Sequence, residues 1–262
     1  MRIFAIETST ERLSLAIIDG KRNFAREIDA GQRHSELAIA AIADLFAEAK
    51  MAPADVDVIA FGQGPGSFVG VRIACGLAQG MAMGAGKKLT AVPTQMALAE
   101  QALRAHPDAT NVLVAIDARM NEIYLAAYQR NAHEASGWCE LISPMLVKPN
   151  ELPPLSGVNF VGIGSAFDSP MLQAALEAQY KNVLQKIVCA ALPCASDVAV
   201  IAQRQYALGI GIGIGIGMLN PGEAAPLYLR NHVAQTISER AAEKNRAAVK
   251  PDVVLASKIV LA

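Results

Sequence analysis

The sequence is poor in the residues that hold metal ions and covalent cross-links. Its cysteines and histidines number four each in 262 residues. Cys189 and Cys194 have no second cysteine pair and no nearby histidine to complete a zinc site. No two histidines lie three or four residues apart on a predicted helix, and so few cysteines make no disulfide framework in a chain this long. These absences exclude a disulfide scaffold and leave no visible metal centre.

An excess of charge of either sign is also lacking, and we expect no leader segment. Lys and Arg number 23 against 24 Asp and Glu, for a formal net charge of −1. A chain so balanced has no broad basic surface for phosphates, which disfavours tight nucleic-acid binding by this chain alone. The N-terminus enters an apolar segment directly, and the most apolar window, 67–85, is interrupted by Arg72, Gln79 and several glycines. We therefore predict a cytoplasmic protein with no membrane span.

The apolar residues that are present predict a regular order of strands and helices. Three β-rich runs, at 2–6, 13–18 and 23–28, precede a helix predicted at 35–50. A strand at 56–61, a glycine-rich turn at 62–66 and a helix at 67–83 complete a β-β-β-α-β-α pattern. A similar order restarts in the second half. Its predicted elements are strands at 112–116 and 123–129 around a polar turn at 117–122, a strand and glycine turn at 160–165, and helices at 170–179 and 195–207.

Two halves that both open with strand, turn and strand predict a duplicated α/β architecture with a cleft between two lobes. We place the first lobe at 1–104 and the second at 108–230, with terminal residues that return to the first lobe. A tail at 231–262 follows. The alternating Gly-Ile tract at 209–217 disfavours both helix and strand, and a surface loop or repeat expansion explains it better than a functional device.

The first polar turn carries Glu7, Thr8, Ser9 and Thr10, and two interpretations apply to it. Its backbone N–H groups and hydroxyls can face a phosphate, or it is simply a capped β-turn, which is the commoner case. The glycines at 62–66 precede a helix but are not followed by Lys-Ser or Lys-Thr, so they are no Walker A loop. Local chemistry by itself names no reaction.

Three segments together resemble the bacterial TsaB (YeaZ) family. They are IFAIETST at 3–10, AFGQGPGSFVGVR at 60–72 and AIDARMNEIY at 115–124, and PLYLRN at 226–231 resembles the closing signature of that family. The resemblance covers roughly residues 1–235. It implies an actin-like ATPase-type (ASKHA) fold with two duplicated βββαβα-like lobes. It also implies a supporting role for the catalytic paralog TsaD, which transfers threonylcarbamoyl to the tRNA adenosine next to the anticodon, and for the P-loop ATPase TsaE.

The resemblance implies a pseudo-enzyme scaffold with no catalytic residues and no metal. The catalytic paralog holds a metal with a His-x-x-x-His pair, whereas here His34 is followed four residues on by Ala38. Glu7 stands where the family commonly has aspartate. Glu7, Thr8, Ser9, Thr10 and Asp117 are therefore expected to form vestigial phosphate loops with no cofactor of their own, although ATP at an interface shared with a partner stays open. In this reading tRNA is reached only through the complex.

Two rival functions compete with the scaffold. One is an active ATP-dependent kinase or transferase of the same fold, in which the turns at 7–10 and 117–121 hold the phosphates. The other is a peptidase, an activity once suggested for this superfamily. The sequence shows neither a metal-binding pair nor a recognisable nucleophile and base for a peptidase.

The helix at 67–83 is apolar almost all round, so we expect it to be covered on two sides. Gly70, Ile73, Ala74, Leu77 and Met81 are expected to face the sheet. The predicted partner surface, for a second copy or for the catalytic paralog, lies opposite and is extended by the preceding helix. Its residues are Leu37, Ala41, Phe68, Arg72, Cys75, Gly76, Gln79 and Met83. The alternative is a second layer of the same chain over this helix.

Overall fold

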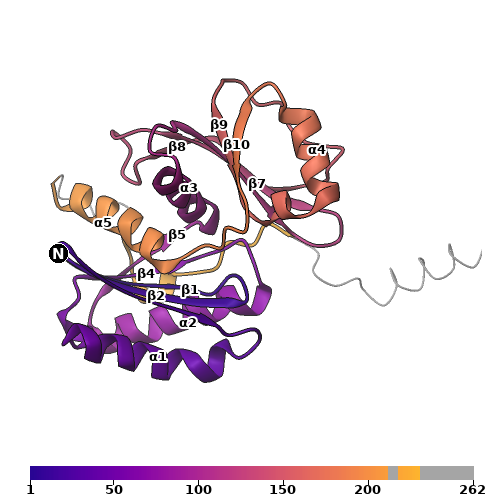
Figure 1. Cartoon of the computed structure of the whole chain (residues 1–262). Coiled ribbons are helices and arrows are strands. Elements are labelled where there is room, and N and C mark those ends of the chain that lie inside the picture. The colour runs from indigo at the N-terminus through magenta and orange to yellow at the C-terminus, as the bar shows by residue number, and fades with distance from the viewer. Residues whose placement is uncertain (212–217, 231–262) are drawn as a thin grey trace, which may run out of the picture. The chain divides into compact units, whose positions relative to one another are not determined.

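The computed structural model describes residues 1–211 and 218–230, and Met1–Leu229 form one compact unit with a mixed β-sheet at its N-terminal end (Figure 1). The strand order of this sheet is β11-β5-β4-β1-β2-β3. Strands β1, β4 and β5 run parallel, and β2, β3 and β11 pair antiparallel with their neighbours. The strands are β1 (Arg2–Glu7), β2 (Arg12–Asp19), β3 (Arg22–Asp29), β4 (Val58–Gly62), β5 (Lys88–Val92) and β11 (Met218–Leu219).

A second sheet repeats this order with the later half of the chain. Its strand order is β10-β9-β6-β7-β8, in which β10, β9 and β6 run parallel and β7 and β8 pair antiparallel with their neighbours. The strands are β6 (Asn111–Asp117), β7 (Ile123–Arg130), β8 (Trp138–Val147), β9 (Phe160–Ile163) and β10 (Leu184–Val188). Helix α1 (His34–Ala49) joins β3 to β4 in the first half, whereas 148–159 join β8 to β9 without a helix. The halves are thus duplicated, and the second lacks one helix.

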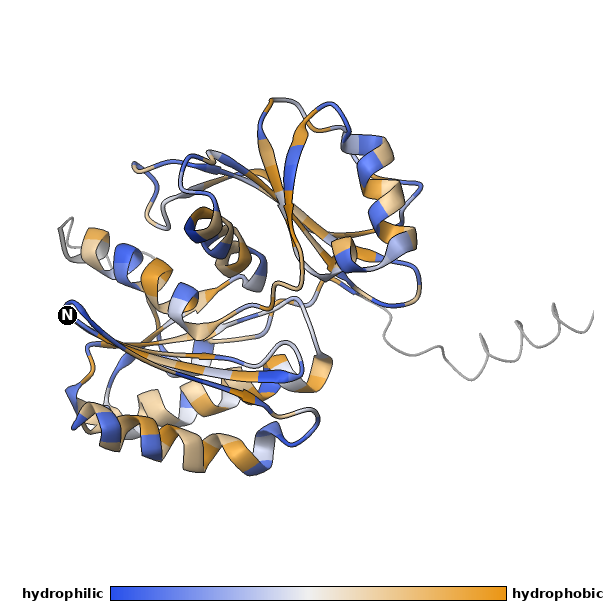
Figure 2. Ribbon diagram, in the orientation of Figure 1, coloured by the Kyte–Doolittle hydropathy of each residue, from blue (hydrophilic) through white to orange (hydrophobic). Residues whose placement is uncertain are grey.

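The helices form layers outside and between the sheets. Helices α1 and α2 (Phe68–Ala85) cover the outer face of the first sheet, and α4 (Pro170–Tyr180) covers the outer face of the second. Helices α3 (Thr94–Ala105) and α5 (Ala195–Gly211) lie between the sheets. Polar and apolar residues alternate along α1 and α4, as expected for helices with one solvent-facing side (Figure 2).

Alternate side chains of β1 point to opposite faces of the first sheet and pack into two different hydrophobic cores. Ile3 and Ala5 belong to the central core with α3 and α5, and Phe4 and Ile6 belong to the outer core with α1 and α2. Successive side chains of a strand point to opposite faces, so a strand covered on both faces is apolar throughout. All four of these side chains are fully buried.

The fold class agrees with the sequence prediction of an actin-like ATPase-type fold, and most of the predicted elements are present. The elements predicted from the sequence do not include β5, α3, β8, β10 and β11. Most of the Gly-Ile tract at 209–217 and all of the tail at 231–262 lie outside the described residues. In the described part of the chain, α2 alone has the length and composition to cross a membrane, a test that core helices of soluble proteins also pass.

The predicted orientation of α2 is wrong by one residue step. Its buried face consists of Gly70, Val71, Ala74, Cys75, Ala78 and Ala82. Prediction assigned the larger Ile73, Leu77 and Met81 to this face, but the smaller residues occupy it. A helix with small residues toward a sheet can approach it closely, and this leaves the larger side chains at the flank. Cys75, expected on the outward surface, therefore lies in the core, as does Ala41 of α1.

Candidate functional site

The turn after β1 is packed tightly against the segment that leads into α2. The Ser67 N–H donates to the Ser9 carbonyl at 2.7 Å, and the Thr8 hydroxyl donates to the Gly70 carbonyl at 2.7 Å. A Cβ atom at Gly70 would lie 1.9 Å from the Thr8 carbonyl oxygen, and one at Gly66 would lie 2.5 Å from Ser9 Cβ. These glycines are required because the turn occupies the space of their side chains. From the sequence we conclude only that the glycines at 62–66 form no Walker A loop, and we place Gly70 on the sheet-facing side of the helix without predicting this contact.

The carboxylate of Glu7 lies inside this turn and not in solvent. Its side chain accepts hydrogen bonds from the Ser9 backbone N–H at 2.6 Å and from the Thr94 hydroxyl at 2.9 Å. Glu7 is 1% exposed, and burial raises the pKa of its carboxyl above the ordinary value although these hydrogen bonds act the other way. A donor of the turn that could meet a phosphate is thus directed at a carboxylate of the same chain.

The hydroxyls of the turn face the protein. Thr8 and Ser9 are buried, and the Ser9 hydroxyl has no hydrogen-bond partner within the described residues. The Thr10 hydroxyl accepts a hydrogen bond from the Arg12 N–H at 3.2 Å. The Thr8 and Thr10 hydroxyls and the Ser9 N–H are thus engaged in hydrogen bonds within the chain.

Asp117 lies in the corresponding turn of the second half. Its Oδ1 accepts a hydrogen bond from the Arg119 N–H at 2.7 Å, and its own N–H donates to Ser165 Oγ at 3.0 Å. Arg119, Met120 and Asn121 have φ angles of 62°, 56° and 57°. This left-handed conformation is unfavourable for Arg and Met, whereas Asn tolerates it. Asp117 thus accepts a hydrogen bond from its own turn and is half-buried, whereas Glu7 is fully buried and also accepts one from Thr94.

The outward face of α2 exposes an aromatic and arginine cluster. The Arg72 guanidinium lies 3.3 Å from the Phe68 ring centroid and 5.1 Å from that of Tyr228. Phe68 is 45% exposed, Val69 64% and Met83 72%. Arginine and aromatic side chains are enriched at the centres of protein interfaces. Phe68, Arg72, Gly76 and Met83 thus lie on the surface, as predicted.

A layer of the same chain covers one flank of α2. The Gln79 amide donates to the carbonyls of Pro221 and Ala224 at 2.9 and 3.1 Å, so this residue, predicted for the partner surface, is half-buried and bonded within the chain. Leu37 of α1 is half-buried against the outer core, while Ile39 is 67% exposed. The exposed surface is therefore narrower than predicted and includes Val69 and Ile39.

A metal site was not expected from the sequence. His34, at the start of α1, is buried, and its Nε2 has no hydrogen-bond partner in the described part of the chain. Among residues 1–211 and 218–230, no group of three or more His, Cys, Asp or Glu side chains is placed to hold a metal ion.

The sequence is similar to a known protein family and to named bacterial proteins. The family model for TsaD, tRNA N6-adenosine threonylcarbamoyltransferase, matches residues 28–207. The tRNA threonylcarbamoyladenosine biosynthesis protein TsaB of Escherichia coli K12 is 36% identical over 242 residues, which cover 89% of this chain and 96% of that protein. The protein of the same name from Haemophilus influenzae is 32% identical over 240 residues, covering 89% and 95%.

Solved structures are similar over the same range. YeaZ from Pseudomonas aeruginosa superposes with a TM-score of 0.71 at 29% identity, covering 87% of this chain and 99% of that one. A Pseudomonas aeruginosa protein described as similar to the peptidase YeaZ superposes with a TM-score of 0.75, at the same identity and coverage.

Proposed function

The chain belongs to the TsaB family, and from this membership we propose that it is a non-catalytic subunit of the assembly that installs N6-threonylcarbamoyladenosine on tRNA. In this role it supports or activates a TsaD-type catalytic subunit in the cytoplasm, together with a TsaE-type ATPase. It reaches tRNA through the complex, in keeping with its balanced charge.

The observation that carries the non-catalytic part of the proposal is the buried carboxylate of Glu7. A phosphate at the β1–β2 turn would meet a carboxylate that already takes the Ser9 N–H and the Thr94 hydroxyl. An anion placed beside a buried carboxylate is repelled unless the carboxylate is protonated or moves. This disfavours the rival kinase or transferase, which needs the turn open to a nucleotide. ATP at an interface shared with a partner stays part of the proposal.

The environment of Cys194 gives no support to a cysteine peptidase activity. Cys194 Sγ lies 2.9 Å from Asp197 Oδ2, but it is buried, and burial raises the pKa of its thiol to about 11. A thiol that stays protonated at neutral pH is a poor nucleophile. The name attached to the Pseudomonas relative therefore gains no support from this thiol.

The partner surface proposed for the TsaD-type subunit, or for a second copy, is the outward face of α2 with the neighbouring face of α1. We call this surface the α2 face; it consists of Ile39, Phe68, Val69, Arg72, Gly76 and Met83. Its apolar side chains and its stacked arginine support this use.

A reconstituted modification assay tests the proposal. The chain is co-purified with the TsaD-type paralog of the same organism, and threonylcarbamoyladenosine formation on tRNA is measured with and without it. We expect a stable complex and a rate that depends on the chain. Turnover of magnesium-ATP by the isolated chain, or a rate unchanged by its omission, would overturn the proposal.

Alanine variants refine this assay. Glu7→Ala, Thr8→Ala and Asp117→Ala, in variants that still fold and assemble, are expected to keep modification within about tenfold of the parent, because none of these side chains acts on substrate. A thousandfold loss in a stable, assembled variant is the size expected for a catalytic group and would contradict the scaffold role.

A further inference from the structure

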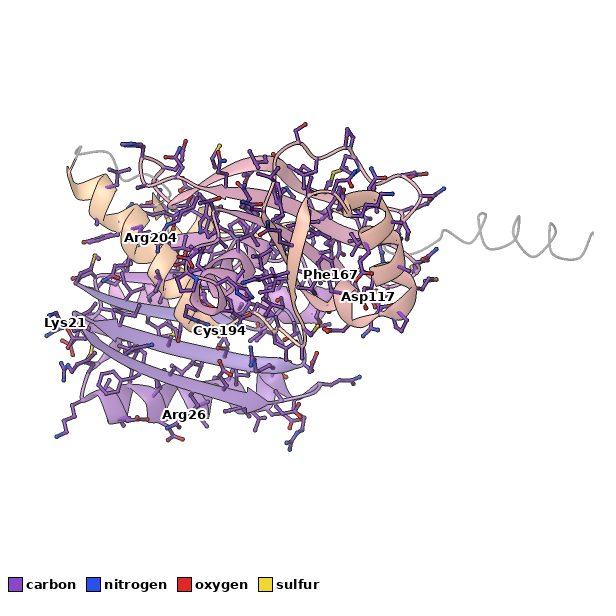
Figure 3. All side chains as sticks on the ribbon, turned by 45° about the horizontal axis from the view of Figure 1, so that its top comes forward. Lys21, Arg26, Asp117, Phe167, Cys194 and Arg204 are labelled. Atoms are coloured by element: carbon purple, nitrogen blue, oxygen red, sulfur yellow. The ribbon has the colours of Figure 1, made fainter. Side chains whose placement is uncertain are left out.

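A cavity of about 470 Å³ lies between the two inner helices and the hairpin that joins β7 to β8. Its volume is in the range of small-molecule sites. Figure 3 shows Arg204, one of its lining residues, at the α5 side of the molecule and Asp117 at the opposite side. The lining residues are Leu103, Arg130, Ala132, Glu134, Ala135, Gly137, Arg204, Ala207 and Leu208.

One side of this cavity is held by a partly buried ion pair, in which Glu100 is buried and Arg204 is half-exposed. Arg204 donates through both terminal nitrogens to the Glu100 carboxylate, at 2.6 and 2.7 Å, and the indole N–H of Trp138 donates to the same carboxylate at 3.1 Å. Gly137 has φ of 85°, and a Cβ there would lie 3.0 Å from Arg204 Nη1. The guanidinium therefore lies directly against the hairpin backbone, and its charge is balanced by Glu100 beneath it.

The hairpin wall is ordered by its own hydrogen bonds. The Asn131 N–H donates to the Gly137 carbonyl at 2.9 Å, and the Gly137 N–H donates to the Glu134 carbonyl at 2.9 Å. Arg130 begins this hairpin, and its N–H donates to the Thr110 carbonyl at 2.8 Å. Two opposite charges, Arg130 and Glu134, are thus presented from one defined loop.

Within the described residues, these two charged side chains have no charged partner. Neither Arg130 nor Glu134 takes part in an ion pair among the described residues, and the two side chains do not pair with each other. The remaining side chains of the wall are aliphatic, from Leu103, Ala132, Ala135, Ala207 and Leu208. The cavity thus combines aliphatic walls with one cation and one anion that are unpaired in the described part of the chain. Its net charge is near zero because Glu100 balances the third charge, that of Arg204.

We propose that this cavity binds a small aliphatic zwitterion, either a free amino acid or a short aliphatic peptide. Arg130 receives the carboxylate, Glu134 receives the ammonium group, and the aliphatic walls bury the side chains. A neutral ligand with separated charges matches these walls better than an anion or a cation, because either of those would leave one rim charge unpaired. The inference is independent of the role proposed for the α2 face.

Trp138 makes the proposal directly measurable. It is the only tryptophan of the chain and hydrogen-bonds to Glu100 below the cavity, so its fluorescence should respond to ligand. We expect leucyl-leucine to bind with a Kd of about 0.1–1 mM, the range for a ligand of this size. Titration calorimetry gives the affinity independently. Free leucine in the same titration distinguishes an amino acid from a peptide as the better ligand.

Blocked ligands and matched variants test the two charge contacts. Leucyl-leucine amide lacks the carboxylate and N-acetyl-leucyl-leucine lacks the ammonium group, and each should bind at least about tenfold more weakly. Arg130→Gln should weaken leucyl-leucine by a similar factor yet leave the affinity for the amide unchanged, since the partner of Arg130 is already gone. Glu134→Gln should behave likewise toward the acetylated peptide.

Two further variants give the controls. Ala207→Phe fills the cavity from an exposed position on α5 and should abolish binding, whereas Arg33→Gln removes an exposed arginine elsewhere and should change nothing. No saturable binding of leucine or leucyl-leucine by the folded parent would overturn the proposal. So would binding that Arg130→Gln and Ala207→Phe leave unaltered.

Discussion

At the residue scale, three buried carboxylates, those of Glu7, Glu100 and Asp197, have different hydrogen-bond partners. Glu100 is satisfied by a guanidinium and an indole, and Glu7 by a backbone N–H and a hydroxyl. Asp197 pairs with Arg104 and accepts a hydrogen bond from the Cys194 thiol. Burial of a charge is unfavourable unless such partners compensate, so each carboxylate should leave a distinct mark on stability.

Asp197 predicts a pH dependence of stability. Burial raises the pKa of its carboxyl from 3.8 to about 6, although Cys194 and Arg104 favour the charged form. Folding therefore favours the protonated acid, and this contribution is full below pH 3.8 and lost as pH rises through about 6. Its size is at most about 3 kcal/mol.

Urea unfolding of the parent and of Asp197→Asn across this pH window measures the effect. The variant cannot titrate at this position, so the free energy of unfolding should decline less with rising pH than in the parent. Parallel pH profiles for the two proteins would contradict the raised pKa.

The contact between Gly62 and Glu7 predicts that the cost of a side chain at position 62 depends on the length of the side chain at position 7. A Cβ at Gly62 would lie 1.8 Å from Glu7 Oε2, so Gly62→Ala should lower the free energy of unfolding by about 2–4 kcal/mol. In a Glu7→Asp background the carboxylate is one methylene shorter, and the same change should cost clearly less.

Gly76→Ala is the matched control for this cycle. Gly76 is helical, and a Cβ there meets no atom within 4 Å, so alanine should raise stability by up to about 1 kcal/mol. Equal costs of Gly62→Ala in both backgrounds would show that Glu7 is not the obstructing group.

At the element scale, the rotation of α2 is set at its first turn. The Ser67 N–H and the Gly70 carbonyl are both bonded to the β1–β2 turn, at Ser9 and Thr8. These contacts orient the start of the helix, and the small residues that follow let it approach the sheet. The outward side consequently carries Val69, Arg72, Gly76 and Met83.

The α2 face predicts that one bulky substitution blocks assembly. Gly76→Trp places a large side chain in the open space above the helix, so it should abolish pairing with the TsaD-type subunit or with a second copy by steric blockage. The monomer should stay folded because Gly76 is exposed and a Cβ there meets no described atom within 4 Å.

Size-exclusion chromatography and circular dichroism decide this prediction, with Lys181→Trp at an exposed position after α4 as the control. A folded Gly76→Trp protein that still forms both complexes with unchanged affinity would show that the α2 face is not the interface.

At the scale of the whole molecule, the two halves exchange helices. Helix α5, from the second half, packs on β1, β2 and β4, and α3, from the first half, packs on β6 and β9. The central core therefore contains residues of both sheets and both helices. The inner face of each sheet is therefore covered in part by a helix from the other half of the chain.

This exchange predicts that the first half does not fold alone. A fragment of residues 1–104 leaves Ile3, Ala5, Val58 and Ala60 without the cover of α5, so it should bind a hydrophobic dye and lack a cooperative urea transition in far-UV circular dichroism. Addition of a peptide of residues 190–208 should reduce dye binding. A cooperative transition of the fragment alone would contradict this dependence.

Local sequence determined the elements whose signal is strong and nearby. The polar turns, the β-rich runs around them and the helices at α1, α2, α4 and α5 follow from periodicity and from turn residues. The family motifs identified the fold class. Missed elements such as β8 and β10 are partly exposed edge strands of the second sheet, where the apolar pattern is diluted.

Tertiary structure decided the rest, because those features depend on residues far apart in sequence. Sequence named Glu7 but not its burial, which depends on Thr94 and on the absence of a side chain at Gly62. It named the two faces of α2 but not their rotation, which the β1–β2 turn sets. The ion pair of Glu100 with Arg204 joins helices 104 residues apart, and no local pattern encodes a contact that only the exchange of α3 and α5 creates.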